Sequence, residues 1–360
     1  MTLFYFNVYV HSPLRQGMFV NYIKARVSMK RFLKNLSLQL FIFFISFFFT
    51  VHVSWATPDD SSSLGHDQSS VSNTQASTEK DGSVKPEQTD PAQTKAGREI
   101  SVVPEQKNPA ERKDFFTRGQ KTLLLNAGSW AFILIYGLAE WDYSESGFHF
   151  ENEHWFGRKT EYGGLDKLSH AWSSYAMSHF FSYVYRKWEY TDKEANLYGA
   201  LSSLGVNTFM EIADGFSPSQ GFSYEDMVMN IVGCGLGYVL GAYPDLARKV
   251  DFRMEITPKF DAEDLKIGTN YERQTYLLVA KADGFDFIEN PYLKYLEFHL
   301  GYNAHDYKGY DEDGPDHRHR HIYAGLGFNV SKLLQKYAKT KVLDYIQIPY
   351  TSVRYGFSPD

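Results

Sequence analysis

The sequence predicts an α+β protein, in which a four-helix unit precedes an antiparallel, β-rich C-terminal region. Four stretches of 16–18 residues between positions 115 and 243 contain no Asp, Glu, Lys or Arg and are bounded by helix-starting and helix-ending residues. From Asp251 onward, apolar residues recur at every second position, which is the period of a strand. We therefore divide the chain into residues 1–56, 57–114, 115–250 and 251–360.

Residues 1–56 resemble an export signal. The basic stretch 29–34 precedes an apolar run at 36–53, and Ser54 and Ala56 supply small residues at the −3 and −1 positions of a cleavage site. We interpret Met29 as the true start and residues 1–28 as an over-long N-terminus. An uncleaved anchor is the alternative, because the apolar run is long for a signal peptide. No cysteine follows the run, so this segment offers no site for a lipid.

The rest of the chain is acidic and has one cysteine. The formal charge is −6, and without the six basic residues of 1–56 it becomes −12, with 31 basic against 43 acidic residues. This balance argues against nucleic acid as a partner. We interpret Cys234 as a small buried hydrophobe. Residues 57–114 are rich in Ser, Thr, Asp, Gln and Pro and predict a disordered linker.

Four segments predict the helices: Thr122–Ala139, Leu168–Tyr185, Ala195–Met210 and Met227–Tyr243. Thr191 with Glu194, and Ser223 with Asp226, have the spacing of capping boxes. Gly215 and Pro244 end the third and fourth helices.

Charge placement bears on whether these helices span a membrane. Alternating helices put nine basic residues at one end: Arg112, Lys113, Arg118, Lys121, Arg186, Lys187, Lys193, Arg248 and Lys249. The positive-inside rule would place that end in the cytoplasm, whereas the export signal places it outside. We therefore favour a compact periplasmic bundle whose basic end rests on a membrane surface of anionic lipid. Spanning helices remain the alternative, because the segments are only slightly short for it.

Polar side chains converge at the other end of this bundle. The second helix begins with Asp166, Lys167 and His170, the third ends with Glu211 and Asp214, and the fourth begins with Asp226 and Asn230. Spacings of three and four residues put each set on one helix face. Glu140 and Asp142 would join them, whereas His179 lies on the opposite face of its helix and is excluded.

Three interpretations of this cluster stay open. Closed polar networks hold bundles together, and Lys167 could pair with Glu211 or Asp214. The same residue types also suit a divalent metal, which the sequence does not identify, or a His170 general base oriented by a carboxylate. We favour a structural network and expect no organic cofactor. Gly233, Gly237 and Gly241 form a stripe that lets another helix approach closely.

Several motifs resemble a known family. The segments 153–158 (EHWFGR), 166–172 (DKLSHAW), 211–215 (EIADG) and 221–226 (GFSYED) are similar to the YfiM-like family of uncharacterised, predicted periplasmic lipoproteins. The similarity covers about a quarter of the chain and extends, more distantly, to VanZ-like membrane proteins. It implies a location in the periplasm or cell envelope and supplies no reaction. The missing lipid-attachment cysteine and the long C-terminal region depart from the family.

The C-terminal region predicts four or five antiparallel strands. Alternation marks 252–256, 296–302 and 322–330, and 274–281 is a further strand. These strands are too few to close an outer-membrane barrel alone. His317, His319 and His321 share one face if extended, as a solvated strand or a metal or anion site. Lys332–Ala338 predicts a short amphipathic helix.

These features predict an exported envelope protein that acts as a non-catalytic module binding or organising membrane, wall or a protein partner. The alternative is a hydrolase or transferase of envelope lipid or glycan that uses the His170 cluster. The sequence has no nucleophile motif, phosphate loop or strong metal spacing to support the second function.

Overall fold

The computed structural model describes residues 28, 30, 115–258, 271–307, 316–334 and 341–360. The chain forms two units, one comprising residues 1–57 with 116–360 and the other residues 58–115. The first of these contains all the helices and strands considered below. The signal peptide and linker expected at 1–56 and 57–114 lie outside the described residues, apart from positions 28 and 30.

The four expected helices are present, each slightly longer than its uncharged core. They are α3 (Arg118–Glu140), α4 (Leu165–Lys187), α5 (Asp192–Asp214) and α6 (Tyr224–Ala242). Thr191 and Glu194 form a complete capping box at the start of α5. At α6, Ser223 accepts a hydrogen bond from the backbone N–H of Asp226, so only that half of the expected box is described. Pro244 begins the short α7 (Pro244–Ala247) instead of continuing α6.

A six-stranded sheet follows the helices in the order β7-β3-β4-β5-β6-β8. Its strands are β3 (Val250–Ile256), β4 (Gln274–Lys281), β5 (Leu296–His305), β6 (His319–Phe328), β7 (Ile346–Gln347) and β8 (Ser352–Phe357). All neighbours pair antiparallel except β3 and β7, which pair parallel. The α+β prediction is confirmed, but the expected number of strands was too low because β7 and β8 were missed.

Two C-terminal details differ from expectation. The amphipathic helix expected at 332–338 is α8 (Val330–Leu334), and residues 335–338 of that prediction lie outside the described part. The strand expected to reach Val330 ends at Phe328. His319 and His321 lie in β6, whereas His317 precedes it.

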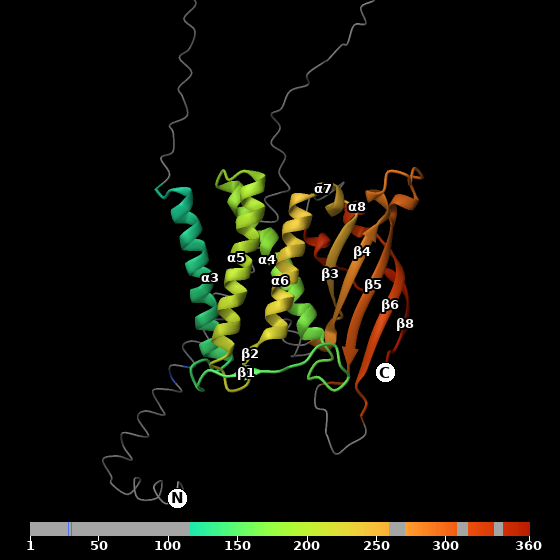
Figure 1. Ribbon diagram of the computed structural model, residues 1–360. Coiled ribbons are helices and arrows are strands. Elements are labelled where there is room, and N and C mark those ends of the chain that lie inside the picture. Colours follow the sequence, from blue (N-terminus) through green and yellow to red (C-terminus); the bar gives the residue numbers. More distant parts are fainter. Residues whose placement is uncertain (1–27, 29, 31–114, 259–270, 308–315, 335–340) are drawn as a thin grey trace, which may run out of the picture. The chain divides into compact units, whose positions relative to one another are not determined.

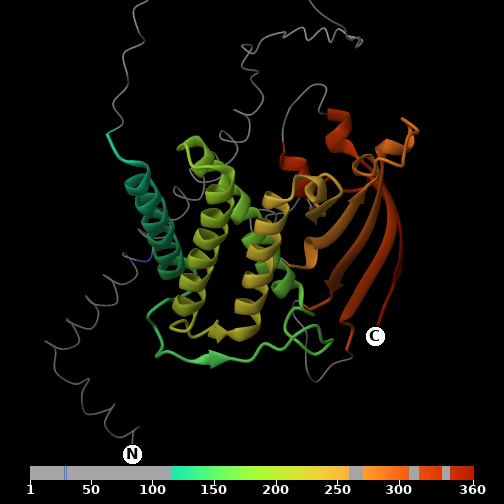
Figure 2. The ribbon, with the colours of Figure 1, turned by 45° about the horizontal axis from the view of Figure 1, so that its top comes forward.

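Helix α4 is central in this unit, as Figures 1 and 2 show. At its N-terminal half, Leu165 and Tyr175 pack in a core with Phe252 and Met254 of β3 and Tyr276 of β4. Its C-terminal half forms a second core with α5, and apolar residues of α3 pack against that core. The helices thus stand beside one another, and α4 joins them to the sheet.

The glycine stripe of α6 packs against its neighbours, as predicted. A Cβ atom on Gly233 would lie 2.1 Å from the backbone oxygen of Ala171, and one on Gly237 would lie 2.7 Å from the Ser178 Cβ. A Cβ on Gly241 would lie 2.7 Å from Asn196 Oδ1 on α5. Cys234, beside the stripe, is buried as expected.

Replacing Gly233 by alanine should therefore separate α6 from α4 and destabilise the fold by about 1–3 kcal/mol. Gly235→Ala is the matched control, because no atom lies within 4 Å of a Cβ at that position. The control should be neutral or stabilising, since alanine is the better helix former. Thermal melting of both variants checks this, and equal melting temperatures would contradict the close approach of the two helices.

Candidate functional site: an acidic cavity at one end of the helices

The cavity is built where three helix ends meet a loop. Helix α4 starts after Gly163 and Gly164, whose positive φ angles turn the chain into the helix. The strands β1 (Phe150–Glu151) and β2 (Phe222–Ser223) pair parallel, which ties the segment before α4 to the start of α6. This pairing carries Glu153 to the ends of the helices.

A cavity of about 400 Å³ opens there. Its walls include five carboxylates, Glu153, Asp166, Glu211, Asp214 and Asp226, together with His170. The side chains of Glu153 and His170 keep 21% and 16% of their surface exposed, so the cavity is connected to solvent.

Lys167 is the cation at the base of this cluster. Its side chain is fully buried, and its Nζ lies 2.7 Å from Asp166 Oδ2 and 3.0 Å from Asp226 Oδ1. It also donates a hydrogen bond to Glu153. The expected pairing of Lys167 with Glu211 or Asp214 was wrong, because the side chain turns toward the Glu153 loop instead of toward the end of α5.

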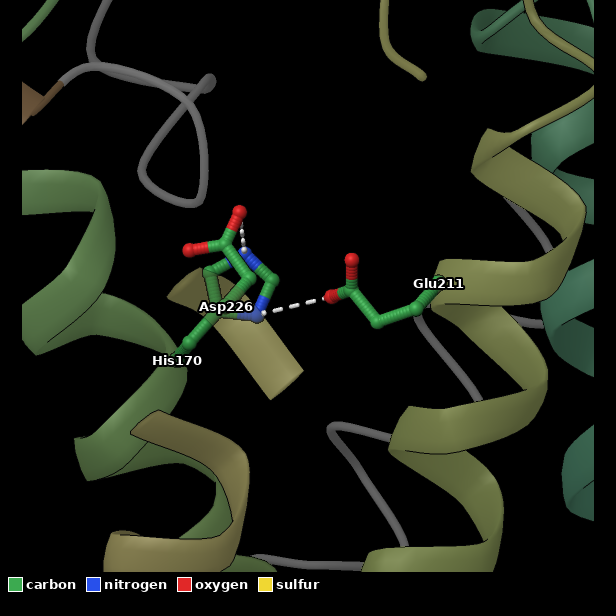
Figure 3. Close-up of side chains that lie close together, drawn as sticks. All are labelled: His170, Glu211 and Asp226. Atoms are coloured by element: carbon green, nitrogen blue, oxygen red, sulfur yellow. Dashed lines mark ion pairs between the residues drawn. The ribbon is translucent and has the colours of Figure 1, made fainter. Parts of the chain in front are cut away.

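His170 lies between two carboxylates, as Figure 3 shows. Its Nδ1 is 3.2 Å from Glu211 Oε1, and its Nε2 is 3.8 Å from Asp226 Oδ2. The first contact has the distance of an ion pair without the geometry of a hydrogen bond. A neutral imidazole donates from only one nitrogen, so one of the two carboxylates would then face an acceptor.

Asn230 is hydrogen-bonded to the cluster. It donates a hydrogen bond to Glu211 Oε1 at 3.3 Å and accepts one from Ser174 at 2.8 Å. Asp214 accepts a hydrogen bond from Tyr143 at 2.6 Å. Glu140 and Asp142, which were expected to join the cluster, do not line the cavity. That expectation was wrong because the chain leaves α3 in a turn that brings Tyr143 inward.

The structure thus brings together all seven residues of the predicted cluster. His179 lies elsewhere on α4, where it contacts the Tyr345 hydroxyl and the Gly237 carbonyl, so its exclusion agrees with the structure. Sequence reasoning missed Glu153 as a site residue. Its position beside His154 in the first of the family-like motifs was a signal, but helix periodicity cannot place a loop residue.

Negative charge exceeds positive charge in the cavity. Burial, followed by repulsion from Asp226, raises the pKa of Glu153 to about 8. A carboxylate that holds its proton at neutral pH indicates that Lys167 does not neutralise all of its neighbours. A bound cation would remove the imbalance.

Among the described residues, two sets of three ligand atoms lie within 4.8 Å of one another, and both are in this cavity. Glu153, Asp166 and Asp226 form the first set, which Lys167 already occupies with its ammonium group. His170, Glu211 and Asp226 form the second. Two ligands in a tetrahedral zinc site lie about 3.4 Å apart. The 3.2 Å between His170 Nδ1 and Glu211 Oε1 is close to this spacing, whereas Asp226 lies 3.8 Å from Nε2 on the other side of the ring.

The predicted histidine run on β6 does not form such a set in the part of the chain that the structure describes. The ring of His321 lies 5.8 Å from that of His305 and 6.4 Å from that of His319. These exposed or half-buried rings fit the solvated strand that the sequence favoured.

A family model described as "Predicted periplasmic lipoprotein (DUF2279)" matches residues 152–242. The match begins at the Glu153 loop and ends with α6, so it contains Lys167, His170 and the five carboxylates named above, and none of the six-stranded sheet. No curated protein and no solved structure matches the chain. The protein is therefore a periplasmic protein of the cell envelope, similar over this segment to a family of unknown function.

Proposed function

We propose that this envelope protein is a non-catalytic module that binds a divalent cation in the acidic cavity. The observation that carries the proposal is the solvent-connected cavity in which Glu153, Asp166, Glu211, Asp214 and Asp226 gather around His170. His170, Glu211 and Asp226 would supply the ligands, while Lys167 neutralises the neighbouring set. The motif resemblance to YfiM-like and VanZ-like proteins, which includes these residues, belongs to the same proposal.

The imidazole and carboxylate ligands suit zinc, manganese or iron better than calcium, which prefers six to eight oxygens. Asn230 and Ser174 hold Glu211 in place from behind, as supporting partners do in metal sites. The bound ion would fix α4, α5 and α6 at one end, where a partner in the envelope could recognise the ordered surface.

Titration of the full chain with Zn²⁺ and Mn²⁺ by calorimetry tests this proposal. We expect saturable binding that His170→Ala weakens by about 10-fold or more, since a ligand is lost. His317→Ala is the matched control, because this exposed histidine lies outside the cavity and should leave the affinity unchanged. Equal affinities of the wild type and His170→Ala would overturn the proposal.

The same titration should depend on pH in a stated direction. Glu153 holds a proton up to a pKa of about 8 because of its burial and of Asp226. A cation beside Asp226 favours the ionised carboxylate, so binding should release a proton and tighten as the pH rises from about 6 to 8. Binding that weakens over this interval would contradict the assignment.

A hydrolase or transferase acting on envelope lipid or glycan is the second candidate. The contact of His170 with Glu211 favours it, because a carboxylate at Nδ1 orients an imidazole as general base. The position of Asp226 near Nε2 weighs against it, since the second nitrogen does not face open space. Product release from purified envelope lipid or glycan by the wild type, but not by His170→Ala, would replace the non-catalytic function.

A further inference from the structure

Strands β5, β6 and β8 have their polar and apolar faces reversed relative to a sheet that faces water. On β5, Glu297 and His299 are 1% and 0% exposed, while Leu296, Phe298 and Leu300 between and beside them are 37–49% exposed. A sheet with one face in water normally has hydrophobic residues inside and polar residues outside. The reversed pattern therefore calls for an apolar environment at the outer face.

The charged groups of the buried polar face pair with one another within the protein. Arg354 of β8 pairs with Glu255 of β3 at 2.9 Å, although three strands separate them in the sheet, so the sheet curls around this face. Inside it, Arg253 contacts Glu297 at 2.9 Å and also pairs with Asp251. The reversed arrangement is thus a property of the fold, because the buried charges on this face of the sheet form ion pairs with one another.

The outer face is apolar across three neighbouring strands. Phe298 on β5 pairs with Leu326 on β6, which pairs with Val353 on β8. Leu326 and Val353 are 60% and 83% exposed, and Tyr355, two residues along β8, is 80% exposed. An apolar patch that crosses three strands marks an interaction surface.

The helices also expose apolar surface. Leu123 and Leu124 of α3, Leu201 of α5, and Ile231 and Val232 of α6 are each more than half exposed. By length and composition, α3 could cross a membrane, and only 11% of its apolar window is buried. In Figures 1 and 2, α3 and β8 stand at opposite ends of the row of helices and strands. A single protein partner would have to reach both ends of this row to cover these surfaces.

The dimensions fit a bilayer. Each helix has an uncharged core of 16–18 residues, which is about 24–27 Å long at 1.5 Å per residue. Strands β5 and β6 have 10 residues each, which is the length of a tilted membrane strand. Charged residues of the four helices lie in their first and last turns.

We propose that the acyl chains of a lipid bilayer cover these apolar surfaces of α3, α5, α6, β5, β6 and β8. The folded unit is then held in an envelope membrane by helices and sheet together, with the acidic cavity at one membrane surface. This proposal does not depend on cation binding. The positive-inside rule concerns helices that are inserted from the cytoplasm. An exported chain that enters the bilayer from the periplasmic side is not subject to it, so the basic end of the helices no longer conflicts with the export signal.

Fluorescent labelling in vesicles tests the proposal. The full chain with V353C or L326C, labelled with an environment-sensitive nitrobenzoxadiazole dye, is reconstituted in vesicles of phosphatidylethanolamine and phosphatidylglycerol. We expect a blue-shifted emission that brominated acyl chains quench. F287C is the matched control, because Phe287 is equally exposed (80%) but lies in the loop after β4. Its label should be quenched much less.

Extraction with alkaline carbonate gives the second measurement. The wild type should stay in the membrane pellet, whereas Leu326→Arg should lose this retention, because an arginine facing lipid near the bilayer centre is strongly unfavourable. Phe287→Arg should be retained. Release of the wild type by carbonate, or a soluble dimer whose labels at 353 and 326 are protected without lipid quenching, would overturn the proposal.

Discussion

Replacing Lys167 by methionine is expected to destabilise the protein by about 3–5 kcal/mol, the loss found when one partner of a buried ion pair is removed. The ammonium group is fully buried and contacts Glu153, Asp166 and Asp226, so its removal leaves three carboxylates without a counter-charge. Unfolding of the full chain in detergent, followed by circular dichroism, measures the loss.

Lys187→Met is the control for this substitution. Lys187 lies on the same helix, but its side chain is exposed and faces the ring of Tyr183 at 5.6 Å. Such a contact contributes about 0.5–1 kcal/mol, so this variant should be close to the wild type. The loss in Lys167→Met should be smaller at pH 6 than at pH 8, because Glu153, whose pKa is about 8, is already protonated at pH 6 and Lys167 then has fewer negative charges to neutralise. A variant as stable as the control would show that Lys167 does not neutralise the cluster.

The helices were predictable because each has an uncharged core that sequence alone displays. Their ends were less so: α4 begins at Leu165 and ends at Lys187, and charged residues such as Asp166 and Arg186 occupy its terminal turns. Those charges suit the helix dipole, although they interrupt the apolar pattern. Strand β8 was missed even though Val353, Tyr355 and Phe357 alternate, because so short a run has no turn signal that separates it from a loop.

The part of the cavity that helix residues form was predictable from helix periodicity, whereas the part that loop residues form was not. Residues on α4, α5 and α6 meet because alternating helices bring these ends together, and that geometry follows from short connections. Glu153 depends on a two-residue parallel pairing between Phe150–Glu151 and Phe222–Ser223, which no periodicity indicates. The outward-facing apolar residues of the sheet were visible as alternation, but only the structure shows that the polar set is the buried one.

The second large effect is expected for Glu211→Gln, which should show whether the cluster is a binding site or a structural network. Glutamine keeps an oxygen that can accept the hydrogen bond of Asn230, so no buried partner is left unsatisfied. Glu211 is 1% exposed and shares the cavity with Asp214 and Asp226, so removing its charge relieves repulsion. We expect an unchanged or higher melting temperature without metal, as for binding sites that hold like charges at a cost in stability.

Cation binding should be lost in the same variant. A metal ion that binds only the folded protein stabilises it, by about 2.7 kcal/mol at a free metal concentration of 100 times the dissociation constant. Saturating Zn²⁺ or Mn²⁺ should therefore raise the melting temperature of the wild type. Glu211→Gln should lack this increase, since one of the three ligands is gone. Glu225→Gln is the matched control, because Glu225 is equally buried and lies outside the cavity lining, so its response to metal should match the wild type. A fall in the melting temperature of Glu211→Gln, with the metal response intact, would instead assign Glu211 to a structural network.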